Sequence, residues 1–192
     1  VAGAGSGKTK TLTSRLLRLV SQGIDPKNIL AITFTNKAAK EMKDRLKAMS
    51  PGSRDLPYMG TFHSLGARLL RQEAYIFERN SDFVIFDDDD MKRLVKKVIN
   101  RLPELKDWGV AKVLQYFSLF KTELTREEED LRAENEELRV AFVLYEQALK
   151  NNNAFDFDDL IEKIVRLLRD YPEKLKKYQN QFRYILVDEY QD

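Results

Sequence analysis

Residues 2–9 read Ala-Gly-Ala-Gly-Ser-Gly-Lys-Thr, a glycine-rich stretch at the beginning of the chain. The stretch follows the phosphate-binding pattern Gly-x-x-x-x-Gly-Lys-Ser/Thr, except that Ala2 stands in place of the first glycine. Apolar residues from Leu12 to Val20 then recur with helical spacing, which predicts a helix over residues 8–22. The pattern therefore predicts a phosphate-binding loop between a strand end and a helix. The alternative is a flexible glycine-rich turn without a ligand.

Each residue type in this stretch suits contact with phosphate. The glycines let successive backbone N–H groups turn towards phosphate oxygens, and the positive end of the following helix points at the same place. We expect Lys8 to reach the β- and γ-phosphates of a nucleotide and the Thr9 hydroxyl to ligate Mg²⁺. The predicted nucleotide-binding residues of the loop are Gly3, Ala4, Gly5, Ser6, Gly7, Lys8 and Thr9.

The other end of the chain supplies acidic side chains at a strand end. Residues 182–187, FRYILV, read as a strand, and Asp188 and Glu189 follow it directly. In a parallel sheet, ligands bind at the carboxyl ends of strands. Asp188 would then hold Mg²⁺ near Lys8, and Glu189 would deprotonate an attacking water. The alternative for the two acids is a solvated turn.

Strand and helix patterns alternate near both ends of the chain, with a helical block between them. Apolar runs and alternation predict strands at 29–34, 58–61, 83–86 and 182–187. Helical spacing predicts helices at 8–22, 36–49, 62–78, 91–102, 110–121, 125–150, about 158–169 and 171–181. The sequence thus predicts an α/β fold with a parallel sheet and an all-helical insertion.

Composition excludes several classes of protein. The 192 residues include 33 basic and 31 acidic side chains, one His and no Cys. Disulfide scaffolds, Cys-ligated zinc, thiol catalysis and multi-His metal sites are therefore excluded. No apolar run is long enough for a membrane span, which favours a cytoplasmic protein. Residues 8–54 hold eleven basic against three acidic residues, which indicates either a phosphate-facing surface or a solvated helix face.

Five motifs, in order along the chain, resemble those of the UvrD/Rep/PcrA-type superfamily 1 DNA helicases. They are Ala2–Thr9, Ala31–Ala39, Gly60–Ser64, Phe155–Leu160 and Asp188–Asp192. The resemblance implies a P-loop NTPase (RecA-like) parallel sheet, truncated here, with a helical insert. It implies a partial motor domain 1A over residues 1–86 and 154–192, and an insert 1B over residues 87–153.

The resemblance also implies roles for individual residues. Lys8, Asp188, Glu189 and Gln191 would be catalytic, with Mg²⁺ held by Thr9 and Asp188 and ATP as the substrate. Lys10 stands where many relatives carry an arginine near the adenine. Single-stranded DNA would contact Thr35, Asn36, Lys37, Thr61, Phe62 and His63. Junctions of single and double strands, and repair or replication proteins, are the other expected partners.

Several of these residues could have a purely structural role instead. Thr35 or Asn36 would instead cap the following helix. Phe62 would belong to the core, and His63 would be a satisfied structural histidine. Asp156, Asp158 and Asp159 suggest a metal site, but we favour helix capping and structural hydrogen bonds for them.

Three functions follow. The first is a motor fragment of an ATP-dependent DNA helicase with 3′-to-5′ polarity, the polarity resting on the resemblance alone. The second is the helicase subunit of a recombination helicase–nuclease. The third is a binding module without turnover, because we interpret the chain as a fragment that lacks the second motor domain.

Overall fold

The computed structural model describes residues 8–49, 55–123 and 136–190. The chain divides into two compact units. The first unit comprises residues 1–65 and 171–192, and the second comprises residues 66–170. None of the helices in the described ranges is both long and apolar enough to cross a membrane.

The first unit is built on a three-stranded parallel sheet with the order β2-β1-β5. The strands are β1 (Ile29–Thr33), β2 (Tyr58–Thr61) and β5 (Tyr184–Val187). Every residue of the central strand β1 is buried, as expected for a parallel strand covered on both faces. The structure therefore confirms the predicted parallel sheet. Strand β1 pairs on one side with β2, which follows it in the chain, and on the other side with β5, from the far end of the chain.

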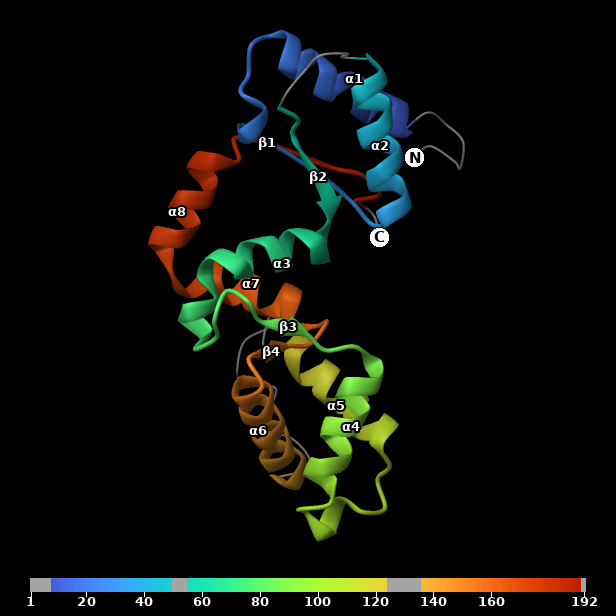
Figure 1. The fold of residues 1–192 in the computed structure, drawn as a ribbon, viewed down its shortest axis with the longest axis vertical. Helices are drawn as coiled ribbons and strands as arrows, with labels where there is room; N and C mark the ends of the chain where they lie inside the picture. The colour runs from blue at the N-terminus through green and yellow to red at the C-terminus, as the bar shows by residue number, and fades with distance from the viewer. Residues whose placement is uncertain (1–7, 50–54, 124–135, 191–192) are drawn as a thin grey trace. The chain divides into compact units, whose positions relative to one another are not determined.

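Helices α1 and α2 lie beside this sheet (Figure 1). The helices of the unit are α1 (Lys8–Ser21), α2 (Asn36–Met49) and α8 (Pro172–Gln181), with a short 3₁₀ turn η1 (Pro26–Asn28). Leu16 of α1 and Met42 of α2 are fully buried in one cluster with Ile29 and Ala31 of β1. Leu186 of β5 packs against the same cluster, so α1 and β5 share one core.

The second unit is mostly helical. Its helices are α3 (Phe62–Glu73, which begins in the first unit), α4 (Asp88–Ile99), α5 (Val110–Glu123), α6 (Glu136–Asn151) and α7 (Asp159–Asp170). The turns η2 (Ala74–Phe77) and η3 (Pro103–Leu105) and a parallel pair of strands, β3 (Val84–Ile85) and β4 (Ala154–Phe155), complete it. Figure 1 shows α4, α5 and α6 grouped together. Their core includes Val95, Phe117 and Tyr145.

The observed boundaries of several elements differ from the predicted ones. The predicted helix 62–78 ends at Glu73 and continues as the 3₁₀ turn η2. The predicted helix 91–102 is α4, which starts earlier because the Asp87 side chain accepts the backbone N–H groups of Asp89 and Asp90. Strand β4 was not predicted. The part of the predicted helix 125–150 before residue 136 lies outside the described residues.

The two units do not have the boundaries predicted for the motor domain and its insert. Residues 66–86 and 154–170 belong to the helical unit. Close packing of α3 against α7 accounts for part of this: a Cβ atom on Gly66 would lie 1.9 Å from the Leu160 carbonyl oxygen. The predicted domain division itself remains a prediction.

Candidate functional site at the carboxyl edge of the sheet

The three parallel strands bring the predicted DNA contacts and the two predicted catalytic acids to one edge of the sheet. Thr33 is in register with Thr61, and Ile32 is in register with Val187, so β1, β2 and β5 end beside one another. The predicted DNA contacts follow β1 and β2, and the predicted catalytic acids follow β5. This is the edge at which open parallel sheets bind ligands.

Asp188 is held firmly at the end of β5. Its backbone N–H donates to the Ile32 carbonyl oxygen at 2.8 Å, which extends the ladder one residue beyond the strand. The residue is 8% exposed, and its Oδ1 accepts the Glu189 backbone N–H at 3.2 Å. Glu189 is half-buried and has a φ of 51°, which is uncommon outside glycine. Backbone conformations of this kind cluster at functional sites.

The end of β1 confirms one capping alternative. The Thr35 hydroxyl accepts the Ala38 backbone N–H at 3.1 Å, so Thr35 is the N-cap of α2. Asn36 is the first residue of the helix, and the capping alternative for Asn36 is wrong. Capping uses the hydroxyl as an acceptor and leaves its proton available to a phosphate oxygen. Thr35, Asn36 and Lys37 are all exposed.

The end of β2 has a similar cap. Thr61 and Ser64 bond reciprocally: each side-chain oxygen accepts the backbone N–H of the other residue, at 2.8 and 3.2 Å. The Thr61 side chain is thus engaged within the protein, and the residue is 7% exposed. Phe62 is 44% exposed, so its interpretation as a core residue is wrong. His63 is half-buried.

Phe34 is a candidate that the predicted site residues do not include. The apolar run 29–34 predicts that Phe34 belongs to a buried strand, but β1 ends at Thr33 and Phe34 is 64% exposed. The sequence feature that could have identified Phe34 is its position directly before Thr35, Asn36 and Lys37, which are predicted to contact DNA. Phe34 and Phe62 follow paired residues of neighbouring strands, so two exposed aromatic rings stand at one sheet edge.

Most of the predicted phosphate loop lies outside the described residues. This applies to Gly3, Ala4, Gly5, Ser6 and Gly7 and to the side chains of Lys8 and Thr9. Gln191, which was predicted to be catalytic at the other end of the chain, also lies outside the described residues. Helix α1 begins at Lys8, as the sequence predicted, and Lys10 is exposed in its first turn. The meeting of Lys8 with Asp188 remains a prediction.

Asp188 provides the kind of ligand that Mg²⁺ prefers. Magnesium is usually held by one or two carboxylates together with substrate phosphates and waters. In the described ranges no cluster of three or more His or acidic side chains could hold a metal ion. A nearly buried carboxylate at the sheet edge fits a metal that reaches the protein with a nucleotide, and Asp188 would hold it.

Asp156 and Asp159 have the structural role that we favoured. The same expectation for Asp158 is wrong: among the described residues its side chain makes no hydrogen bond, and only its carbonyl oxygen accepts N–H groups of α7. The Asp159 backbone N–H donates to Asp156 Oδ1 at 2.9 Å, and the Asp156 backbone N–H donates to Asp159 Oδ2 at 3.1 Å. The Lys121 ammonium, 2% exposed, lies 2.6 Å from Asp156 Oδ2 and 2.8 Å from Asp159 Oδ1. Burial opposes the charge on Lys121, but these carboxylates outweigh it and hold its pKa well above the usual range. Nothing in the sequence indicated Lys121 as their partner.

The described residues define an α/β protein with its candidate site at the carboxyl edge of a parallel sheet. The chain belongs to the family of the UvrD/REP helicase N-terminal domain, which matches residues 1–192. This confirms the resemblance drawn from the five motifs.

Named relatives agree with the family. The chain is 39% identical over 198 residues to the ATP-dependent DNA helicase PcrA of Staphylococcus aureus, and 41% identical over 198 residues to that of Staphylococcus epidermidis. It is 39% identical over 202 residues to the probable DNA helicase II homolog of Mycoplasma capricolum. Each match covers 100% of this chain and 27–28% of the relative. The chain therefore spans about a quarter of the length of these relatives.

Proposed function

We propose that this chain is the ATP-binding part of an ATP-dependent DNA helicase, with a P-loop, RecA-like motor domain. The observation that carries the proposal is Asp188, nearly buried at the carboxyl edge of a parallel sheet against which α1 packs. Helix α1 starts at Lys8, directly after the glycine-rich stretch. We further propose motor domain 1A over 1–86 and 154–192 and insert 1B over 87–153.

Nucleotide binding is divided between the loop and the sheet edge. The loop residues 3–7 would enclose the phosphates, Lys8 would contact the β- and γ-phosphates, and Lys10 would lie near the adenine. Thr9 and Asp188 would hold Mg²⁺, which supplies positive charge to the phosphate oxygens when it is bound. Gln191 would sense the γ-phosphate and couple its loss to the DNA contacts.

Glu189 is proposed as the base that accepts a proton from the attacking water. Its position directly after Asp188 and its left-handed backbone conformation support this role. General-base catalysis contributes about 10²–10⁴-fold to a rate.

The ends of β1 and β2 are proposed as the DNA-binding surface. Helices α2 and α3 both start at this edge, and the positive ends of their dipoles favour phosphate. Asn36 and Lys37 would contact the backbone of the strand, and Phe34 and Phe62 would stack on bases. Helix α2 carries five basic and two acidic residues, which suits a polyanion.

The direction of movement and the DNA substrate rest on the family alone. We propose 3′-to-5′ movement on single-stranded DNA and opening of duplex at single–double strand junctions. Rates of unwinding for partial duplexes with a 3′ or a 5′ single-stranded tail would distinguish the two directions.

Hydrolysis of ATP by the intact protein, with and without single-stranded DNA, tests the proposal. Lys8→Ala and Glu189→Gln should each lower the DNA-stimulated rate by at least roughly 100-fold. Glu189→Gln should still bind ATP. The matched controls Lys97→Ala and Glu104→Gln remove the same charges from exposed positions of the second unit and should leave the rate unchanged. Hydrolysis that survives both site substitutions would refute the proposal.

A further inference from the structure

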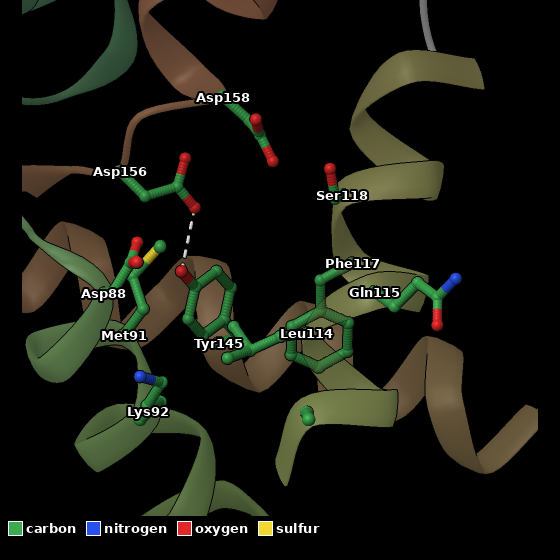
Figure 2. Close-up of a pocket in the computed structure, with 11 residues that line it drawn as sticks. Asp88, Met91, Lys92, Leu114, Gln115, Phe117, Ser118, Tyr145, Asp156 and Asp158 are labelled. Atoms are coloured by element: carbon green, nitrogen blue, oxygen red, sulfur yellow. Dashed lines mark hydrogen bonds between the residues drawn. The ribbon is translucent and has the colours of Figure 1, made fainter.

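The second unit contains a cavity of about 370 Å³ that the proposed motor function does not use. Helices α4, α5 and α6 and the segment between β4 and α7 line it (Figure 2). Its volume is near the lower end of the range of small-ligand sites, roughly 300–1,000 Å³.

The inner surface of this cavity is apolar. Met91 of α4, Leu114 and Phe117 of α5 and the ring of Tyr145 of α6 form it. Phe117 and Tyr145 are fixed in the core of the unit, with ring centroids 5.0 Å apart. The cavity therefore offers a rigid apolar floor to an aliphatic chain.

Acidic side chains also line the cavity. They are Asp88, which is exposed, Asp158, which is half-buried, and Asp156, which is 3% exposed; the cation Lys92 lies with them and pairs with Asp89 at 3.6 Å. Asp156 is already bound, because its Oδ2 accepts hydrogen bonds from Lys121 Nζ and the Tyr145 hydroxyl. Within the part of the chain that the structure describes, the side chains of Asp88 and Asp158 have no ion-pair or hydrogen-bond partner.

The buried ion pairs hold Asp158 in place. Asp156 precedes Asp158 by two residues, and Asp159 follows it directly. Both carboxylates pair with Lys121, and each accepts the backbone N–H of the other residue. The Asp158 carbonyl oxygen accepts the backbone N–H groups of Ile161 and Glu162 at 3.1 and 3.0 Å. Figure 2 shows the Asp158 carboxylate at the cavity, across from Ser118 on α5. This carboxylate is thus presented by a backbone that is fixed on both sides.

We propose that this cavity binds an arginine side chain of a protein partner. The aliphatic stem would lie on Met91 and Leu114, and the guanidinium would meet the carboxylates of Asp88 and Asp158. A planar guanidinium with five N–H donors can bind carboxylates in a bidentate manner, which a compact ammonium cannot.

The negative charge of the cavity lining disfavours nucleic acid as the ligand. Phosphates of nucleic acid would be repelled by Asp88 and Asp158. An adjoining hollow of about 460 Å³ shares Asp88 and Lys92 with the cavity and is also lined by Asp87, Asp89, Phe86 and the exposed Phe157, so acidic and apolar residues continue beyond the cavity. This extension gives room for the residues that flank the arginine in a peptide.

Methyl NMR of the intact protein, labelled at the methionine methyl groups, tests the proposal. The Met91 signal is assigned with Met91→Leu, and Met42 and Met59, buried in the first unit, report non-specific effects. The probe is the blocked pentapeptide acetyl-Gly-Ser-Arg-Ser-Gly-amide. The matched probe carries citrulline, which has the same shape without the charge.

We expect a saturable shift of the Met91 methyl with the arginine peptide, and binding at least tenfold weaker with the citrulline peptide. The double variant Asp88→Asn with Asp158→Asn should weaken binding of the arginine peptide at least tenfold, and Glu104→Gln, an exposed acid of the same unit away from the cavity, should not. Retention of the Met91 chemical shift in the free variant shows that the cavity is intact.

Three results would overturn the proposal. The first is the absence of a saturable shift at peptide concentrations up to about 1 mM, the weakest dissociation constant of interest. The second is equal binding of both peptides, and the third is undiminished binding of the arginine peptide by the double variant. A shift of the Met91 methyl by an oligothymidine strand in place of the peptide would assign the cavity to DNA and would also overturn it.

Discussion

Replacing Lys121 with methionine tests whether its buried ammonium stabilises the helical unit. Methionine is unbranched and of similar length, so Lys121→Met removes the charge and largely keeps the packing volume. Lys121 is 2% exposed, and Asp159 beside it is fully buried. The substitution therefore leaves buried carboxylates without their main partner.

The expected loss follows from the contacts that remain. Removing one partner of a buried ion pair costs about 3–5 kcal/mol. Two features reduce the loss here. Lys163 Nζ remains 3.3 Å from Asp159 Oδ1, and Asp156, whose pKa is raised by burial and by the nearby Asp159 charge, can take up a proton. We therefore expect about 3 kcal/mol, at the lower end of that range.

Hydrogen exchange of the intact protein measures this loss where it occurs. Each 1.4 kcal/mol corresponds to a factor of ten, so protection of the slowest amides in α5, α6 and α7 should fall about 100-fold. The control Lys97→Met changes an exposed lysine of α4 and should lower protection less than about threefold, because surface substitutions cost little. Adding Asp156→Asn to Lys121→Met should restore part of the protection. Equal losses in Lys121→Met and Lys97→Met would refute the reasoning.

Three further predictions concern other parts of the chain. Phe34→Ala should weaken binding of single-stranded DNA by about 1–3 kcal/mol in a fluorescence anisotropy titration, whereas Met49→Ala, also exposed but at the far end of α2, should not; equal effects would contradict the stacking role. Gly66→Ala should destabilise the helical unit by about 1–3 kcal/mol in urea unfolding, because the new methyl group would meet the Leu160 carbonyl oxygen, and an unchanged midpoint would show that the contact is not tight. The free energy of unfolding should fall above pH ~10, since Tyr145, whose pKa is raised by burial and by the Asp156 charge, keeps its proton when folded and loses it when unfolded. Tyr145→Phe should flatten that slope, and an identical slope in the variant would rule out this tyrosine as its source.

Much of the first unit could be predicted because its signals are local. The run of apolar residues in β1 and the helical spacing in α1 and α2 gave these elements to within a few residues. Strand β4 could not be predicted, because its two residues, Ala154 and Phe155, are too short a run to show a pattern. Their partner strand β3 also lies some 70 residues earlier in the chain.

The candidate site was predicted in its residue types more than in its side-chain roles. Thr35 could be given two roles from sequence, and only the hydrogen bond to Ala38 identified it as a cap. Phe34 looked like a strand residue because an apolar run does not show where the strand ends. Lys121 lies 35 residues before Asp156, and no local pattern links a lysine on one helix to a carboxylate on a distant turn.

A crystal structure of the intact protein with Mn²⁺ and a non-hydrolysable ATP analogue would test the nucleotide site most directly, since Mn²⁺ replaces Mg²⁺ and can be located by its anomalous scattering. We predict one strong peak about 2.1 Å from the Thr9 hydroxyl oxygen, beside the Asp188 carboxylate and in contact with the β- and γ-phosphates. A nucleotide and metal bound away from Asp188, or on the opposite edge of the sheet from it, would contradict the proposed motor function.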